Sequence, residues 1–284
     1  MTKKKHAKRV SGKPGKTVPA KSSSLQARLK AMRTKAEAED REPARDSETV
    51  QHGQFYDELA RILFAKDLFQ KNSIVVALLV VCARCVIGHD RWVNMEDSSV
   101  KKALGLSRAT RFRSLATLRD LGLLHKDRQP TPHHIKLNFR YFGMPDKRSQ
   151  KGARFAQLYA KLARMIIDDQ WAAKHPNSAR ILTGLIAALA LHHDKAEKMY
   201  WIRGSSEQFR KCCAIGSNTW KPAMDTLLTG RNPIVIRHPS DRCLYAIRPD
   251  LVRVAGPEKI PPKDLEQRPP ASRIIDLTHK IQRA

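Results

Sequence analysis

The chain has 284 residues, a length that corresponds to about two domains. Its 54 Lys and Arg residues outnumber 27 Asp and Glu residues, which gives a formal net charge of +27 and a pI near 10.3. Such an excess argues against a typical metabolic enzyme and favours a polyanionic partner, either nucleic acid or an anionic membrane surface.

Cysteine content and hydropathy indicate the compartment. The five cysteines are an odd number in a chain whose basic N-terminus lacks the apolar segment of a secretion signal, so we expect reduced thiols. The longest apolar run, Ile74 to Ile87, contains Arg84 and is too short to span a bilayer. These features predict a soluble cytoplasmic protein, associated with the nucleoid or a plasmid if the partner is DNA.

The first 50 residues predict a disordered basic arm. Met1 to Ala36 contains 12 Lys and Arg residues and no acidic residue, and Lys3 to Ser24 has almost no large apolar side chain. Such a segment cannot bury enough surface to order itself, and its charge suits a flexible tether that binds phosphates. A solubilising or targeting tail is the alternative.

Residues 51–143 read as a first module. We expect helices over Gln54 to Gln70, Ile74 to Val86 (capped by Asn72 or Ser73), Ser98 to Leu104 and Arg108 to Leu121. Ser107 is the expected N-cap of the last of these helices, after the turn Gly105-Leu106-Ser107. Short extended segments are expected at Arg91 to Asn94, Leu123 to Lys126 and His134 to Asn138.

Residues 152–255 repeat this order of elements. Helices are expected at Phe155 to Ile166, Ser178 to His192, Ser206 to Cys213 and from Ser217 or Thr219 to Leu228. Strands are expected at Tyr200 to Arg203, Pro233 to Arg237 and Arg242 to Ile247. Trp92 and Trp201 are 109 residues apart, and Ser107 and Ser217 are 110 apart, so the two copies stay in step.

The repeated order predicts the fold class. Helix, helix, short strand, helix, turn, helix and a two-stranded wing is the order of a winged helix-turn-helix module. We therefore expect a mostly α protein with small β-hairpin wings, built from two such modules in tandem. Residues 256–284 should form a proline-rich linker followed by a short helix over Ser272 to Arg283.

The helix Arg108 to Leu121 is the candidate recognition helix. A helical wheel places Phe112, Leu115 and Leu118 inward and an uncharged or basic face outward. Arg113 is the best candidate for a bidentate guanine contact, and the hydroxyl residues suit bases or phosphates. The predicted DNA-binding residues of this module are Lys101, Lys102, Arg108, Thr110, Arg111, Arg113, Ser114, Thr117, Lys126 and Arg128.

The second module is a weaker candidate for base reading. Asn218, Lys221, Pro222, Asp225 and Thr226 face outward on the same wheel, and a carboxylate there would repel phosphate. This module could bind through its wing, accept a different half-site or serve in self-association. Its predicted DNA-binding residues are Lys211, Asn218, Lys221, Arg231, Arg237 and Arg242.

We find no catalytic set, metal site or cofactor motif in the sequence. Cys82-Ala-Arg-Cys85 has a metal-ligand spacing, but it lies within an apolar helix without a second pair, so buried thiols are expected. The chain has no glycine-rich Lys-Ser/Thr loop for ATP. We therefore expect a protein that is not an enzyme and needs no cofactor.

The overall layout resembles the plasmid replication initiators, which carry two winged helices in tandem and bind repeats at a plasmid origin. The resemblance covers Gln54 to Val254 and depends on element order, on Leu104-Gly-Leu-Ser-Arg108 and on Asn177-Ser-Ala-Arg-Ile181. It implies sequence-specific binding of double-stranded origin DNA and recruitment of host helicase or other replication proteins. It also implies that the protein can form homodimers through the first module and binds the repeats as a monomer through both modules.

Two alternatives remain open. A transcriptional regulator could use the same modules, and only the location of its target site would distinguish it from an initiator. A non-enzymatic nucleoprotein assembly protein would instead use the modules for protein contacts and the basic arm for non-specific affinity.

Overall fold

The computed structural model describes residues 51–125, 133–138, 140–144, 154–191, 201–229, 233–253 and 274–276. All described residues belong to one compact unit within Arg45–Ala284. The predicted arm of residues 1–50 therefore lies outside the described part, as does most of the predicted C-terminal tail.

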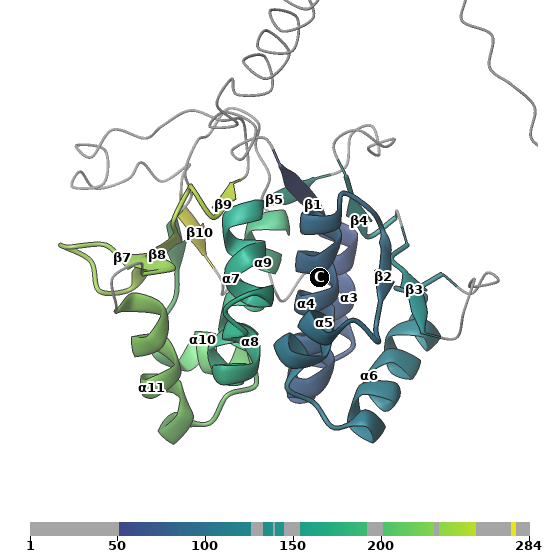
Figure 1. The fold of residues 1–284 in the computed structure, drawn as a ribbon. Coiled ribbons are helices and arrows are strands. Elements are labelled where there is room, and N and C mark those ends of the chain that lie inside the picture. Colours follow the sequence, from purple (N-terminus) through teal and green to yellow (C-terminus); the bar gives the residue numbers. More distant parts are fainter. Residues whose placement is uncertain are drawn as a thin grey trace, which may run out of the picture. The chain divides into compact units, whose positions relative to one another are not determined.

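The first half of the described chain alternates short strands with helices (Figure 1). Its elements are β1 (His52–Tyr56), α3 (Asp57–Ala65), η1 (Leu68–Gln70), α4 (Asn72–Gly88), β2 (Trp92–Asn94), α5 (Ser98–Leu104), α6 (Arg108–Asp120), β3 (His134–Lys136) and β4 (Phe142–Gly143).

The second half follows the same order and adds a strand to its small sheet. Its elements are β5 (Phe155–Tyr159), α7 (Ala160–Ile167), α8 (Trp171–Lys174), α9 (Pro176–Leu191), β6 (Trp201–Arg203), α10 (Ser206–Cys212), α11 (Ser217–Leu228), β7 (Val235–Arg237), β8 (Leu244–Ile247) and β9 (Val252–Arg253). A further strand, β10 (Ile274–Asp276), follows later in the chain. The prediction of a largely helical protein with small sheets is confirmed.

A four-stranded sheet joins the two halves, with the order β4-β1-β5-β9. β1 and β5 pair antiparallel at its centre, with Gln54 opposite Gln157. Each outer strand comes from the end of its own half, because β4 pairs with β1 and β9 with β5. The sheet is therefore built symmetrically from the two copies of the repeat.

Individual hydrogen bonds reproduce this symmetry. The Tyr56 hydroxyl donates to Gln54 Oε1 at 2.8 Å, and the Tyr159 hydroxyl donates to Gln157 Oε1 at 2.9 Å. Across the centre, the Asp57 amide donates to the Arg154 carbonyl and the Ala160 amide donates to the Gln51 carbonyl, both at 2.9 Å. The two halves are thus related by an approximate twofold axis through the β1–β5 pair.

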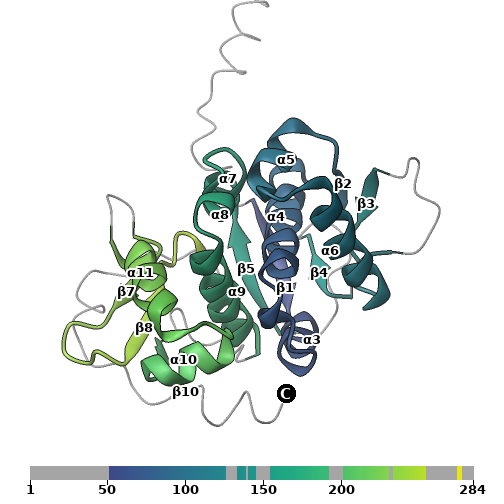
Figure 2. The ribbon, with the colours of Figure 1, turned by 90° about the horizontal axis from the view of Figure 1, so that it is seen from below.

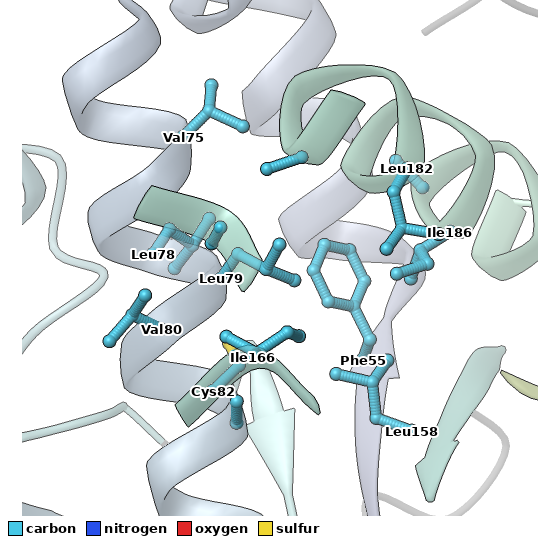
Figure 3. Packing of buried hydrophobic residues seen from close by; sticks show 14 of the residues in the cluster. Phe55, Val75, Leu78, Leu79, Val80, Cys82, Leu158, Ile166, Leu182 and Ile186 are labelled. Carbon is cyan, nitrogen blue, oxygen red and sulfur yellow. The ribbon is translucent and has the colours of Figure 1, made fainter. Parts of the chain in front are cut away.

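One hydrophobic core runs through both halves. The long helix α4 packs against α7 and α9, and α3 packs against α9, which is the arrangement that a twofold axis requires. Figure 3 shows the Phe55 ring among side chains of both copies, with Leu79 of α4 and Leu182 and Ile186 of α9 around it. Residues from both predicted modules therefore exclude water from the same interior.

The prediction that each half begins with a helix at Gln54 or Phe155 was wrong in its first residues. These residues form β1 and β5, and helices α3 and α7 begin only at Asp57 and Ala160. Tyr56 and Tyr159 are extended N-caps, with φ of −76° and −86°. The backbone hydrogen bonds of these residues are made between β1 and β5, across the twofold axis. Residues with helical apolar spacing can therefore form a strand here.

Four further predictions also need correction. The N-cap of α4 is Lys71, without a side-chain hydrogen bond, and not Asn72 or Ser73. The predicted pairing of the two wing strands is reduced to one antiparallel bridge, Leu124 with Leu137, flanked by hydrogen bonds from the His125 amide to the Lys136 carbonyl and from the Asn138 amide to the Leu123 carbonyl, and β3 also pairs with β2. Ile274–Asp276 is a strand parallel to β6, and not the start of a helix. Pro222 lies inside α11, whose N-cap is Gly216, so neither Ser217 nor Thr219 caps this helix.

Helices α6 and α11 occupy equivalent places in the two halves. α6 packs on α4 and α11 packs on α9, and Figures 1 and 2 show these two helices on opposite sides of the core helices. Among the described residues, no helix combines the length and apolar composition needed to cross a bilayer.

Candidate nucleic-acid interface

Helix α5 is capped at both ends, and helix α6 is capped where the turn between them ends. Asp97 caps α5 by accepting the Ser99 amide at 2.8 Å and the Ser99 hydroxyl at 2.6 Å, and these bonds lower the pKa of Asp97. Gly105 ends α5 with a left-handed φ of 58°, and Ser107 caps α6 by accepting the Thr110 amide at 3.3 Å. Ser107 is thus the N-cap that the sequence predicted, and α6 leaves the turn in a defined direction.

Gly105 has a second reason to be glycine. A Cβ atom at this position would lie 2.7 Å from the Cβ of Ala173, in α8 of the other half. The turn of the first half therefore packs closely against the second half.

The outward face of α6 is small, basic and partly aromatic. The residues turned inward are Arg111, Ser114, Leu115 and Leu118, and the exposed residues are Arg108, Ala109, Phe112, Arg113, Ala116 and Asp120. Ala109, Phe112, Arg113 and Ala116 follow the i, i+3, i+4, i+7 spacing of a single helical face. On this face an aromatic ring and a guanidinium group lie between two small residues, which allow a close approach.

The predicted wheel for α6 was rotated from the observed orientation. Phe112, predicted to point inward, is 40% exposed, whereas Ser114, predicted to point outward, is 2% exposed. α6 packs on α4 along the side of Ser114, whose small side chain allows close contact, and Phe112 is left at the edge. Ser114 can therefore contact DNA only if the packing changes.

Arg111 is a third residue whose exposure was predicted incorrectly. It is 5% exposed, and its Nη2 donates to Glu96 Oε1 at 2.7 Å. Glu96 also forms an ion pair with Lys101, and His133 Nδ1 lies 3.8 Å from Glu96 Oε1. The hydrogen bond from Lys101, with the nearby positive charges, lowers the pKa of Glu96.

This Glu96 cluster changes the roles of two predicted phosphate contacts. Arg111 is committed to a partly buried ion pair between the start of α6 and the residues before α5. Lys101 is about two-fifths exposed, but its ammonium group is also paired. Glu96 was absent from the predicted site. The two residues are 15 positions apart in the chain, so a helical wheel of α6 cannot reveal their ion pair.

Three other predicted residues of α6 form a small network. The Ser107 hydroxyl donates to Thr110 Oγ1 at 2.9 Å, and Arg113 Nη2 approaches the same oxygen at 3.5 Å. The Thr117 hydroxyl donates to the Arg113 carbonyl at 3.1 Å. The exposed Arg113 side chain is thus linked to the Ser107 cap through the Thr110 hydroxyl. Thr110 and Thr117 are themselves partly buried.

Of the remaining predicted DNA-binding residues in the first half, two are described by the structure and two are not. Lys102 and Arg108 are exposed near the start of α6, where phosphate contacts were predicted. Lys126 and Arg128 fall in the undescribed stretch 126–132, so their positions stay predictions. Asp120 is exposed at the other end of α6, about 18 Å along the helix from Arg108, so the positive charge is concentrated at the N-terminal end.

The outward face of α11 is chemically different. Asn218, Lys221, Pro222 and Asp225 are exposed, as predicted, and they occupy the positions of Ala109, Phe112, Arg113 and Ala116 in α6. Pro222 is the sixth residue of α11, where it leaves the Asn218 carbonyl without a helical amide partner. A proline thus stands where α6 has its best candidate for a base contact.

The wing of the second half has exposed arginines. Arg237 lies with its guanidinium carbon 5.4 Å from the centre of the Tyr245 ring, and both Arg237 and Arg242 are exposed. Lys211 is exposed beside Glu207, and Arg231 belongs to the undescribed residues. His238, which the sequence placed with these basic residues, is 1% exposed and packs edge-on against Trp201.

Within the described ranges, no group of three or more His, Cys, Asp or Glu side chains could hold a metal ion. Cys82 and Cys85 are buried as expected, and burial raises the pKa of both thiols. These thiols are therefore protonated and unreactive at neutral pH.

Comparison with known proteins gives no family. A scan against protein-family models, a search of curated proteins and a search of solved structures each found no match.

Proposed function

We propose that this protein binds double-stranded DNA through two tandem winged-helix modules, with α6 as the main recognition helix. The observation that carries this proposal is the outward face of α6. A capped helix following a tight turn presents Arg113 between alanines, with Arg108 and Lys102 nearby for phosphates. A face of this kind suits the major groove, where an arginine can donate two hydrogen bonds to guanine.

The two modules have unequal roles in this proposal. Because α11 presents Pro222 and Asp225 where α6 presents Arg113 and Ala116, it offers fewer donors to bases. The second module instead contributes phosphate contacts from Lys221, Arg237 and Arg242. Its half of the target site should be less constrained in sequence.

Replication initiation at a plasmid origin is the biological role that we propose for this binding. The duplicated architecture and the charge of +27 support it, in line with the resemblance of the sequence to plasmid initiators. A transcriptional regulator would need the same recognition surface. The position of the target site distinguishes these roles, since repeats beside the gene for the protein favour an initiator.

The test is selection of bound duplexes from a random DNA pool at about 150 mM salt, where non-specific binding is weak. We expect one motif with two unequal halves. Binding that follows only charge, without any enriched sequence, would contradict the proposal and favour an assembly protein.

Replacement of Arg113 tests the recognition helix directly. Arg113→Ala should lower affinity for the selected site by about 10- to 100-fold, equivalent to about 1–3 kcal/mol, and relax the preference at one base pair. Arg61→Ala removes the same charge from α3, where Arg61 pairs with Asp57, and should leave the preference unchanged. Equal losses for Arg113→Ala on specific and random duplexes would show that Arg113 reads no base.

A further inference from the structure

Phe112 is the one large hydrophobic side chain that is exposed among the residues the structure describes. Its neighbours one turn away on the same face are Ala109 and Ala116, which are too small to cover the ring. Core packing of α6 depends instead on Leu115 and Leu118. The fold therefore gains little from an aromatic ring at this position.

The surroundings of the ring are cationic. The guanidinium carbons of Arg108 and Arg111 lie 5.8 and 5.6 Å from its centre. Arg111 is buried and bonded to Glu96, so the guanidinium group beside the ring is held in place. The ring itself is partly exposed to solvent. The equivalent residue of α11 is Lys221, which shows that the same position tolerates a charged side chain.

The chemistry of the major groove identifies a partner for this ring. Base edges there present hydrogen-bond donors and acceptors, and the 5-methyl group of thymine is their apolar feature. Phe112 is adjacent to Arg113 on the face proposed to enter the groove, so both side chains should reach neighbouring base pairs. We propose that Phe112 is a specificity-determining residue that contacts the 5-methyl group of a thymine next to the guanine read by Arg113.

This inference rests on the proposed function, and its test begins with the selected motif. Each thymine of that duplex is replaced in turn by deoxyuridine, which lacks only the methyl group. At one position, next to the guanine, the natural protein should bind about fourfold more weakly, the change expected for loss of one buried methyl group. Phe112→Ala should bind the two duplexes equally.

Two variants provide controls. Phe112→Leu keeps an apolar side chain and should keep part of the preference for thymine over deoxyuridine. Arg113→Ala should lose the guanine preference but keep the thymine preference. Because Phe112 is exposed, the melting temperature of Phe112→Ala should match that of the natural protein, which confirms that the variant is folded.

The outcomes separate this inference from the proposed function. Absence of any selected motif would overturn the proposed function itself. A clear motif in which every deoxyuridine substitution is neutral would overturn the methyl contact alone. Equal weakening of all duplexes by Phe112→Ala, whatever their thymine content, would also overturn it, because the ring would then stack or wedge without reading a methyl group.

Discussion

Glu96 is the residue that joins the elements around the proposed recognition helix. It binds Arg111 of α6 and Lys101 of α5, and it lies close to His133 just before β3. The positive charges of Arg111 and Lys101 would otherwise repel each other, and the buried Arg111 would lack a partner. The carboxylate therefore positions the outward face of α6 without touching the proposed DNA.

The lowered pKa of Glu96 predicts a pH dependence of stability. A carboxyl group whose pKa is lower in the folded state than its usual 4.5 stabilises the fold above that value. This stabilisation is lost as the pH falls through the folded pKa. Glu96→Gln should therefore be less stable than the natural protein at neutral pH, and the difference should shrink on acidification below about pH 4.5.

Thermal unfolding measured between about pH 3 and pH 7 checks this expectation. Glu207→Gln is the matched control, because Glu207 pairs with the single exposed Lys211 and surface pairs contribute little. A melting temperature for Glu96→Gln that is unchanged at neutral pH would contradict the positioning role.

Individual contacts of α6 show what the sequence could and could not predict. The helix, its Ser107 cap and the outward Arg113 follow from local patterns. The rotation of the helix does not, because Phe112, Leu115 and Leu118 all fit an inward stripe and only packing on α4 selects two of them. The burial of Arg111 depends on Glu96, which a helical wheel of α6 does not contain.

Among the elements, strand β1 packs closely against β4 and α4 at Gly53. A Cβ atom on Gly53 would lie 2.2 Å from Phe142 Cζ of β4 and 2.8 Å from Val86 Cγ2 of α4. Gly53→Ala must therefore displace the buried side chains of Phe142 and Val86, or the backbone that carries them. We expect a loss of about 1–3 kcal/mol in the free energy of unfolding, as is typical of overpacked cores.

Denaturant unfolding with Gly216→Ala as control measures this loss. Gly216 caps α11 with a φ of −68°, and no atom lies within 4 Å of a Cβ built there. This substitution should change stability much less than Gly53→Ala. Similar stabilities for both variants would mean that β1 does not approach its neighbours so closely.

The strands that the sequence missed share one cause. β1, β4, β5, β9 and β10 are each five residues or fewer, and each is paired with residues far away in the chain. β10 pairs with β6, about 70 residues earlier. Local propensity cannot identify such partners, whereas α4, α9 and the short helices before α6 and α11 carry their own periodic signals.

At the scale of the whole described molecule, the two halves keep equivalent contacts while changing their chemistry. Glu58 of α3 pairs with Arg140 before β4, and at the equivalent place Lys161 of α7 pairs with Asp250 before β9. The charges are exchanged but the bridge remains. Burial alone would raise the pKa of Asp250, but hydrogen bonds from Lys161 and Arg248 lower it. The two halves therefore keep an ion pair at the same place in the fold, although the residues that form it differ.

The shared core predicts that neither half folds by itself. A fragment of residues 51–150 would expose the β1 edge that pairs with β5, and the side of α4 that packs on α7 and α9. Loss of that apolar contact removes much of the burial that opposes chain entropy in a domain of about 100 residues. The fragment should therefore lack a cooperative thermal transition, whereas residues 51–253 should unfold in one. If the fragment melted cooperatively near the temperature of the longer chain, the halves would be independent domains, and each recognition helix could then search for its half-site separately.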